Sequence, residues 1–139
     1  FHYGTFFINK GVKQGLEKGM VVISTDGFMV GIITDVAPRF SKVRALTDSK
    51  TNISVRIAGS DVYGFMQGNG SSAPTIGFFS DPEFQPSSGI KIVTSNISGV
   101  LPNDIPVGNM INETDVNVLQ PKKLSRVIVL SFDTQDEYK

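Results

Sequence analysis

Ile8-Asn9-Lys10-Gly11, followed by Gly15, Gly19, Met20-Val21-Val22-Ile23 and Thr25-Asp26-Gly27, is the stretch that decides the fold. Its first half is polar with spaced glycines, and its second half is an apolar, mostly β-branched run that ends in a tight turn. This pattern predicts a loop that delivers the chain into a strand and then into a hairpin. A phosphate-binding P-loop is excluded, because it needs Gly-Lys-Ser/Thr at the start of a helix, whereas Gly19 leads into a strand. The stretch favours a scaffold over an enzyme.

The charge of the chain is balanced overall but uneven along its length. Of 139 residues, 40% are apolar, and 13 basic residues balance 13 acidic ones, which argues against nucleic acid as a partner. Residues 1–70 hold eight basic and five acidic residues, and residues 71–139 hold five basic and eight acidic. The two halves would attract each other within one molecule or head to tail between molecules, with a chance distribution as the equal alternative.

The absence of cysteine and the first residue of the chain bear on its chemistry and origin. Without cysteine there are no disulfides, thiolate zinc sites or cysteine nucleophiles. The chain begins at Phe1, not at methionine, so we interpret it as a fragment of a longer protein.

Short β-branched or aromatic segments alternate with turn signals along the whole chain, which predicts an all-β fold. The segment Val12–Lys18 is the one helical candidate, and it is too short and too rich in glycine to form more than a turn. The predicted strands are Thr5–Asn9, Met20–Ser24, Met29–Val36, Lys42–Leu46, Ile53–Ile57, Tyr63–Gln67, Thr75–Phe79, Lys91–Thr94, Val107–Ile111, Asp115–Leu119 and Arg126–Phe132.

The spacing of these strands predicts two small β-barrels. Gly68-Asn69-Gly70-Ser71-Ser72-Ala73-Pro74 has the composition of a linker or a wide loop and is the best internal boundary. We therefore expect a first barrel over residues 17–68 and a second over residues 69–139. The N-terminal strand, residues 1–10, is expected to join the second barrel by pairing with the C-terminal strands, an assignment that the sequence leaves open.

The residues carry no motif for catalysis or metal binding. The single histidine, His2, lies at the terminus, so a chymotrypsin-like triad has no base, and a Ser–Lys dyad is marked by no motif. Carboxylates such as Asp81, Glu83 and Asp115 are scattered without the alternating spacing of a calcium loop. We expect no enzymatic activity, no cofactor and no metal.

The stretch Phe78-Phe79-Ser80-Asp81-Pro82-Glu83-Phe84 places three aromatic residues beside acids and a proline. Adjacent strand residues face opposite ways, so one of Phe78 and Phe79 is expected in the core. The other ring and Phe84 are then candidates for an exposed partner-binding site, and Phe28 in the first hairpin is a further, weaker candidate.

The ordered series of short motifs resembles the MreC family of bacterial rod-shape-determining proteins. Each motif is weak alone, whereas their order along most of the chain is specific. The matching residues are Ile8-Asn9-Lys10-Gly11, Gly15-Leu16, Lys18-Gly19-Met20-Val21-Val22, Asp26-Gly27, Val30-Gly31, Val36-Ala37-Pro38, Ser41-Lys42-Val43, Leu46-Thr47-Asp48, Ser54-Val55-Arg56, Gly64, Gly68-Asn69-Gly70, Val93-Thr94-Ser95, Gly99-Val100-Leu101-Pro102 and Ile105-Pro106-Val107-Gly108.

The resemblance implies a fold, a location and partners. Proteins of this family have a transmembrane helix and a coiled coil, absent from this fragment, followed by two six-stranded β-barrels on the periplasmic or extracytoplasmic face of the cytoplasmic membrane. They are non-enzymatic scaffolds of the cell-elongation complex. They link MreB and MreD to peptidoglycan-synthesis enzymes, contact the class B penicillin-binding transpeptidase, and self-associate as dimers or filaments.

The chain departs from the family pattern mainly in the loop 78–89, so the resemblance does not extend to partner contacts in that loop. The residues leave two alternative functions open. One is a degenerate double-barrel serine hydrolase, and the other is a peptidoglycan-binding module, although the chain lacks tryptophan and any ladder of aromatic and acidic residues.

Overall fold

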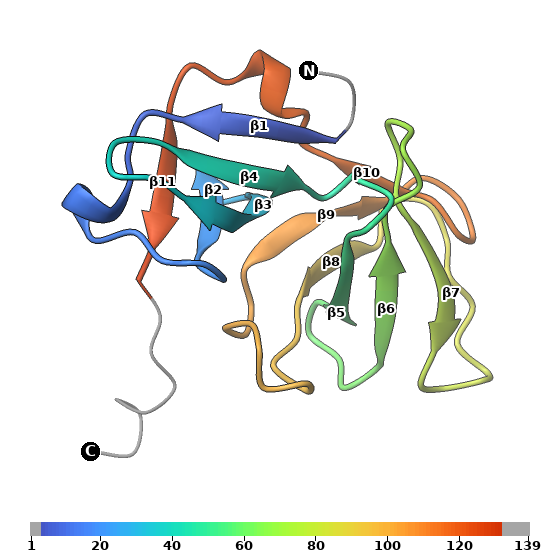
Figure 1. Cartoon of the computed structure of the whole chain (residues 1–139). Coiled ribbons are helices and arrows are strands. Elements are labelled where there is room, and N and C mark those ends of the chain that lie inside the picture. Colours follow the sequence, from blue (N-terminus) through green and yellow to red (C-terminus); the bar gives the residue numbers. More distant parts are fainter. Residues whose placement is uncertain (1–3, 132–139) are drawn as a thin grey trace.

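The computed structural model describes residues 4–131 and has eleven strands arranged in two sheets (Figure 1). His2 and the end of the predicted strand Arg126–Phe132 lie outside the described residues. Each predicted strand is present with its ends within two residues of the expectation, where the structure describes them, because alternation and turn chemistry are local signals. The all-β class is confirmed, and the helical candidate is a single 3-10 turn, η1 (Val12–Gln14).

The first sheet has five antiparallel strands in the described part of the chain, one fewer than expected. Their order in the sheet is β1-β4-β3-β2-β11. A bulge between Val22 and Ile23 and another between Ile33 and Asp35 bend this sheet into a half-barrel. The strands are β1 (Thr5–Ile8), β2 (Val21–Ser24), β3 (Met29–Val36), β4 (Ser41–Ala45) and β11 (Val127–Leu130).

The second sheet is a closed barrel with the order β10-β9-β8-β5-β6-β7. Its two edge strands meet where the Ile76 amide donates to the Thr114 carbonyl at 2.8 Å and the Val116 amide donates to the Pro74 carbonyl at 2.9 Å. The strands are β5 (Asn52–Ile57), β6 (Tyr63–Gln67), β7 (Thr75–Phe79), β8 (Lys91–Thr94), β9 (Pro106–Met110) and β10 (Val116–Val118), and a second 3-10 turn, η2 (Pro121–Lys123), follows them.

These pairings correct the expected boundary at residue 68. Strands β5 and β6 belong to the second barrel, and the chain changes sheets at residues 46–51, where the Thr51 hydroxyl donates to the Ala45 carbonyl at 2.7 Å. Gly68 is needed because it lies against this crossing segment, where a Cβ would overlap the Asp48 carbonyl oxygen. The glycine-rich stretch is therefore a hairpin loop packed on the crossing, not a linker between units.

The expected place of the N-terminal strand is corrected as well. Strand β1 pairs with β4, and the C-terminal strand β11 pairs with β2, so both chain ends belong to the first sheet. The physical reason is that Phe6 and Ile8 bury one face of β1 in the same apolar cluster as Val127 and Val129 of β11. Pairing over such a sequence distance is not encoded in a local pattern.

Two apolar clusters stabilise the two units. One lies inside the curve of the first sheet and is centred on Val22, Val30, Ile33 and Val43. The other fills the second barrel and also takes in Val21 and Met29 from the first sheet. The first sheet therefore buries residues on both of its faces, and the second face packs against the barrel.

Candidate protein-binding surface

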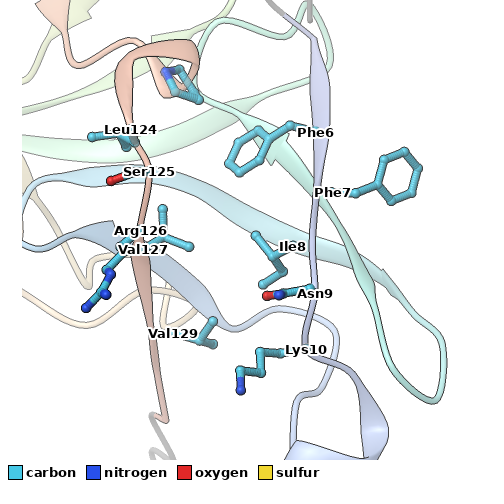
Figure 2. A pocket seen from close by; sticks show the side chains of 11 residues that line it. Phe6, Phe7, Ile8, Asn9, Lys10, Leu124, Ser125, Arg126, Val127 and Val129 are labelled. Atoms are coloured by element: carbon cyan, nitrogen blue, oxygen red, sulfur yellow. The ribbon is translucent and has the colours of Figure 1, made fainter.

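A groove separates the two edges of the first sheet. It has a volume of about 610 Å³ and is lined mainly by β1, β11 and the segment around η2. Figure 2 shows Phe6 and Ile8 pointing toward β11, whereas Phe7 points away. Four successive antiparallel pairings lead across the sheet from β1 to β11. The strand direction reverses at each of them, so the two edge strands β1 and β11 run in the same direction.

An aromatic surface lies on the hairpin of β6 and β7. Alternation in β6 buries Gly64 and Met66 and turns Tyr63, Phe65 and Gln67 outward. The Tyr63 and Phe65 rings are edge to face at 6.2 Å, and the Phe65 and Phe78 rings are stacked at 6.4 Å with 23° between their planes. We call Tyr63, Phe65 and Phe78 the aromatic strip.

The strip is exposed and firmly held. Phe65 is 42% exposed and Phe78 is 54% exposed, so both rings present large apolar area to solvent. Strands β6 and β7 approach closely at Gly64, where a Cβ would overlap the Phe78 carbonyl oxygen. At the open end of the hairpin, the Tyr63 amide donates to the Ser80 hydroxyl oxygen at 3.0 Å. Ordered, solvent-facing rings suit a docking surface because little side-chain entropy is lost on binding.

The predicted site residues do not form one surface, because two of the four are exposed and two pack against the core. Phe78 is exposed, as one of the pair Phe78 and Phe79 was expected to be. Phe79 packs against the barrel core, and Phe84 packs with it at a ring-centroid distance of 5.0 Å. The expectation of an exposed Phe84 is therefore wrong, because the loop after β7 folds its ring back onto Phe79.

Phe28 lies at the tip of the β2–β3 hairpin and is 39% exposed. It lines two cavities of about 330 Å³ each, one shared with Lys91 and Pro106 and the other with Asn117 and Lys123. Phe28 thus lies beside strands β8 to β10 and is remote in the chain from the aromatic strip. The structure does not bring it together with Phe78.

Sequence reasoning missed Tyr63 and Phe65, although a signal was present. The run Tyr63-Gly64-Phe65-Met66-Gln67 alternates, so Met66 in the core places both rings on the opposite face. No local pattern predicts the pairing of β6 with β7, which brings Phe78 beside Phe65.

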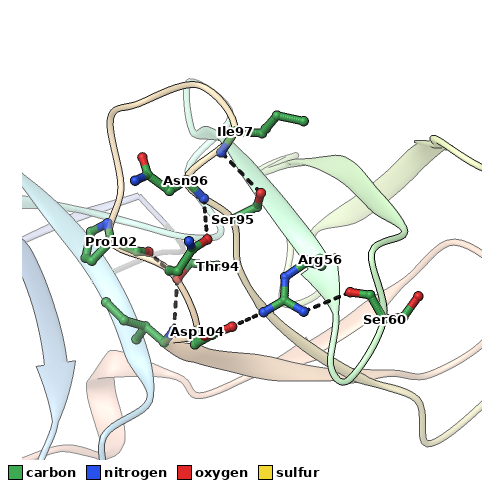
Figure 3. A network of polar contacts seen from close by, with 10 residues as sticks. Arg56, Ser60, Thr94, Ser95, Asn96, Ile97, Pro102 and Asp104 are labelled. Atoms are coloured by element: carbon green, nitrogen blue, oxygen red, sulfur yellow. Dashed lines mark hydrogen bonds and ion pairs between the residues drawn. The ribbon is translucent and has the colours of Figure 1, made fainter.

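A polar network shapes the long loop between β8 and β9 (Figure 3). The buried Thr94 hydroxyl donates to the Pro102 carbonyl at 2.6 Å and accepts from the Ile105 amide at 2.9 Å. Arg56 pairs with Asp104, a residue in the left-handed region at φ 67°, and also donates to the Ser60 carbonyl at 2.8 Å. The loop tip exposes two aliphatic side chains, Ile97 and Val100.

Residues 4–131 contain no cluster of three or more His, Asp or Glu side chains that would hold a metal ion. Over the same residues, no helix is long and apolar enough to cross a membrane.

A family model described as "Rod shape-determining protein MreC, barrel core" matches residues 2–135. The chain belongs to the MreC family. A "Cell shape-determining protein MreC" of Cereibacter sphaeroides is 31% identical over 108 residues, which cover 78% of this chain and 35% of the relative. The MreC of Caulobacter vibrioides is 29% identical over 117 residues, covering 81% of this chain and 33% of the relative. The chain thus spans about a third of the length of the curated MreC relatives that it matches.

Solved MreC structures share the fold. A structure named MreC superposes with a TM-score of 0.83 at 18% identity, covering 91% of this chain and 78% of the other. The MreC of Pseudomonas aeruginosa gives a TM-score of 0.79 at 20% identity, covering 94% and 90%. A complex between Penicillin-Binding Protein (PBP2) and MreC from Helicobacter pylori contains a chain that matches with a TM-score of 0.70 at 20% identity, covering 91% and 86%.

Proposed function

We propose that this chain is the extracytoplasmic part of a non-enzymatic scaffold that binds and organises peptidoglycan-synthesis enzymes during cell elongation. Membership of a family of rod-shape-determining proteins supports a role in cell shape. The observation that carries the binding role is the aromatic strip, since three contacting rings on an outer barrel face have the composition of a protein-binding hot spot.

The proposed partner is a class B penicillin-binding transpeptidase. The Helicobacter pylori MreC forms a complex with PBP2, which supports this class of partner for a protein of the same fold. We propose that the strip docks on the partner and shifts it between conformations through a difference in affinity. Contacts with MreD and MreB, self-association, and anchoring at the outer face of the cytoplasmic membrane are further parts of the proposal, which belong to the whole protein.

The test is a titration of this chain against the transpeptidase ectodomain from the same organism. The double variant Phe65→Ser/Phe78→Ser is expected to weaken the affinity at least about tenfold, because two hot-spot rings are removed. The melting temperature should change little, since both rings are exposed.

A matched control removes a second exposed aromatic pair on the other unit, Phe7 and Phe40, and should leave the affinity unchanged. A Phe79 and Phe84 double variant is unsuitable for this test, because both rings pack against the core. Equal affinity for the wild type and the Phe65/Phe78 variant would discard the strip as the binding surface. The absence of activity has its own test, namely that fluorophosphonate and β-lactam probes should form no adduct with the chain.

A further inference from the structure

One end of the first sheet combines exposed apolar side chains with solvated cations. Phe7 is 64% exposed, Val12 60% and Phe40 52%. The Phe7 and Phe40 rings meet edge to face at a centroid distance of 6.0 Å. We call this surface the basic tip, and define it by Phe7, Lys10, Val12, Lys13, Arg39, Phe40 and Lys42.

The basic tip is built from loops that are held together. The Val12 amide donates to the Ala37 carbonyl at 2.9 Å, and the Lys13 amide donates to the Pro38 carbonyl at 3.1 Å. A Cβ at Gly11 would overlap the Ala37 carbonyl oxygen, so the two loops are in backbone contact. These contacts fix Val12 beside the β3–β4 turn, which carries Arg39 and Phe40. Both η1 and this turn lie at the left end of the molecule in Figure 1.

The cations of the tip are available to a ligand. None of Lys10, Lys13, Arg39 and Lys42 takes part in an ion pair within residues 4–131. Two acidic residues, Glu17 and Asp35, share this end of the sheet, and Asp35 faces Lys42 in the strand register. The basic residues outnumber them, so the tip carries a net positive charge.

The assignment of β11 to the first sheet makes the charge separation larger than the sequence suggested. Residues 4–45 and 119–131, which form the first unit, hold nine basic and three acidic residues. Residues 46–118, which form the second unit, hold three basic and seven acidic residues. A molecule with this asymmetry is oriented by an anionic surface, with the first unit toward it.

We propose that the basic tip docks on the surface of a bilayer that contains anionic phospholipid. Phenylalanine rings and an aliphatic side chain surrounded by lysine and arginine are the composition that binds at the boundary of headgroups and acyl chains. A fluid, planar surface accommodates apolar side chains that project from a strand and two loops, and it requires no shaped groove. Charge complementarity thus identifies the occupant.

Docking through the tip leaves the proposed protein-binding surface free. Strands β6 and β7, which carry the aromatic strip, lie at the opposite end of the molecule from η1 and the β3–β4 turn (Figure 1). A bilayer and a protein partner would therefore engage different units. This inference does not depend on the proposed function, because it concerns other residues and another ligand.

The experiment measures co-sedimentation of the chain with vesicles of phosphatidylcholine alone and of phosphatidylcholine mixed with phosphatidylglycerol. Binding is expected to the mixed vesicles only, and to weaken as salt is raised because the cations act through a screened field. The variants Phe7→Ser/Phe40→Ser and Arg39→Gln/Lys42→Gln should each weaken binding at least about fivefold.

Two matched controls carry the same substitutions on the second unit. The variants Phe65→Ser/Phe78→Ser and Lys50→Gln/Lys91→Gln remove exposed rings and exposed cations elsewhere, and should bind the vesicles as the wild type does. Any one of three results with vesicles would overturn the proposal. They are no binding to the mixed vesicles at low salt, equal binding to both vesicle types, and equal losses of binding in the tip and control variants. Self-association that depends on Phe7 and Phe40, without vesicle binding, would assign the tip to a second copy of the chain and also overturn it.

Discussion

Phe78 and Phe79 are adjacent in β7, yet the first ring lies in solvent against Phe65 and the second packs on the barrel core against Phe84. We expect Phe79→Ala to lower the free energy of unfolding by about 2 kcal/mol, since a partly buried ring leaves a cavity. Phe78→Ala should cost about 0.5 kcal/mol or less. Urea unfolding of both variants checks the difference, and equal losses would contradict the inward packing of Phe79.

Thr94 is the second residue whose role is specific. Its buried hydroxyl bridges the Pro102 carbonyl and the Ile105 amide, so Thr94→Val leaves both groups without this partner. We expect a loss of about 1–3 kcal/mol in the free energy of unfolding. Thr94→Ser keeps the hydroxyl and should lose less than the valine variant. A valine variant as stable as the wild type would show that the bridge contributes nothing.

At the scale of the element, the close approach of β6 and β7 depends on one glycine. A methyl group at Gly64 would meet the Phe78 carbonyl and the Ile76 side chain, whereas one at Gly77 in the partner strand would meet nothing within 4 Å. Gly64→Ala is expected to destabilise the chain by about 1–3 kcal/mol, and Gly77→Ala to be close to neutral. Thermal unfolding compares the two, and a neutral Gly64→Ala would show that the strands separate without cost.

The elements themselves were predictable from the sequence, and their partners were not. Strands such as Asn52–Ile57 follow from the alternation of Ile53, Val55 and Ile57, a signal contained in a few residues. Assigning that strand to the second barrel requires its pairing with β8, some forty residues later, which no local pattern encodes. For the same reason Phe78 was found as a candidate, whereas its contact with Phe65 was not.

At the scale of the whole molecule, β11 completes the first sheet from the far end of the chain. Deleting residues 126–139 should leave the outer edge of β2 unpaired and uncover Val22, whose cluster loses Val127 and Val129. We expect faster hydrogen exchange at β2 and β3 amides, with protection in β5, β6 and β8 largely kept. Uniform loss of protection across both units would show that the two sheets unfold as one.

Because the ribosome makes the chain from its N-terminus, this arrangement sets the order in which the two units can be completed. The second barrel is one uninterrupted stretch from β5 to β10, so all of its strands have been made before β11 emerges. The first sheet begins earlier, but about a hundred residues separate β2 from its partner β11 in the chain. Until β11 has been made, β2 is an unpaired edge strand. The part of the molecule that is translated first is thus the part that is finished last, and the acidic barrel is complete before the basic half-barrel receives its final strand.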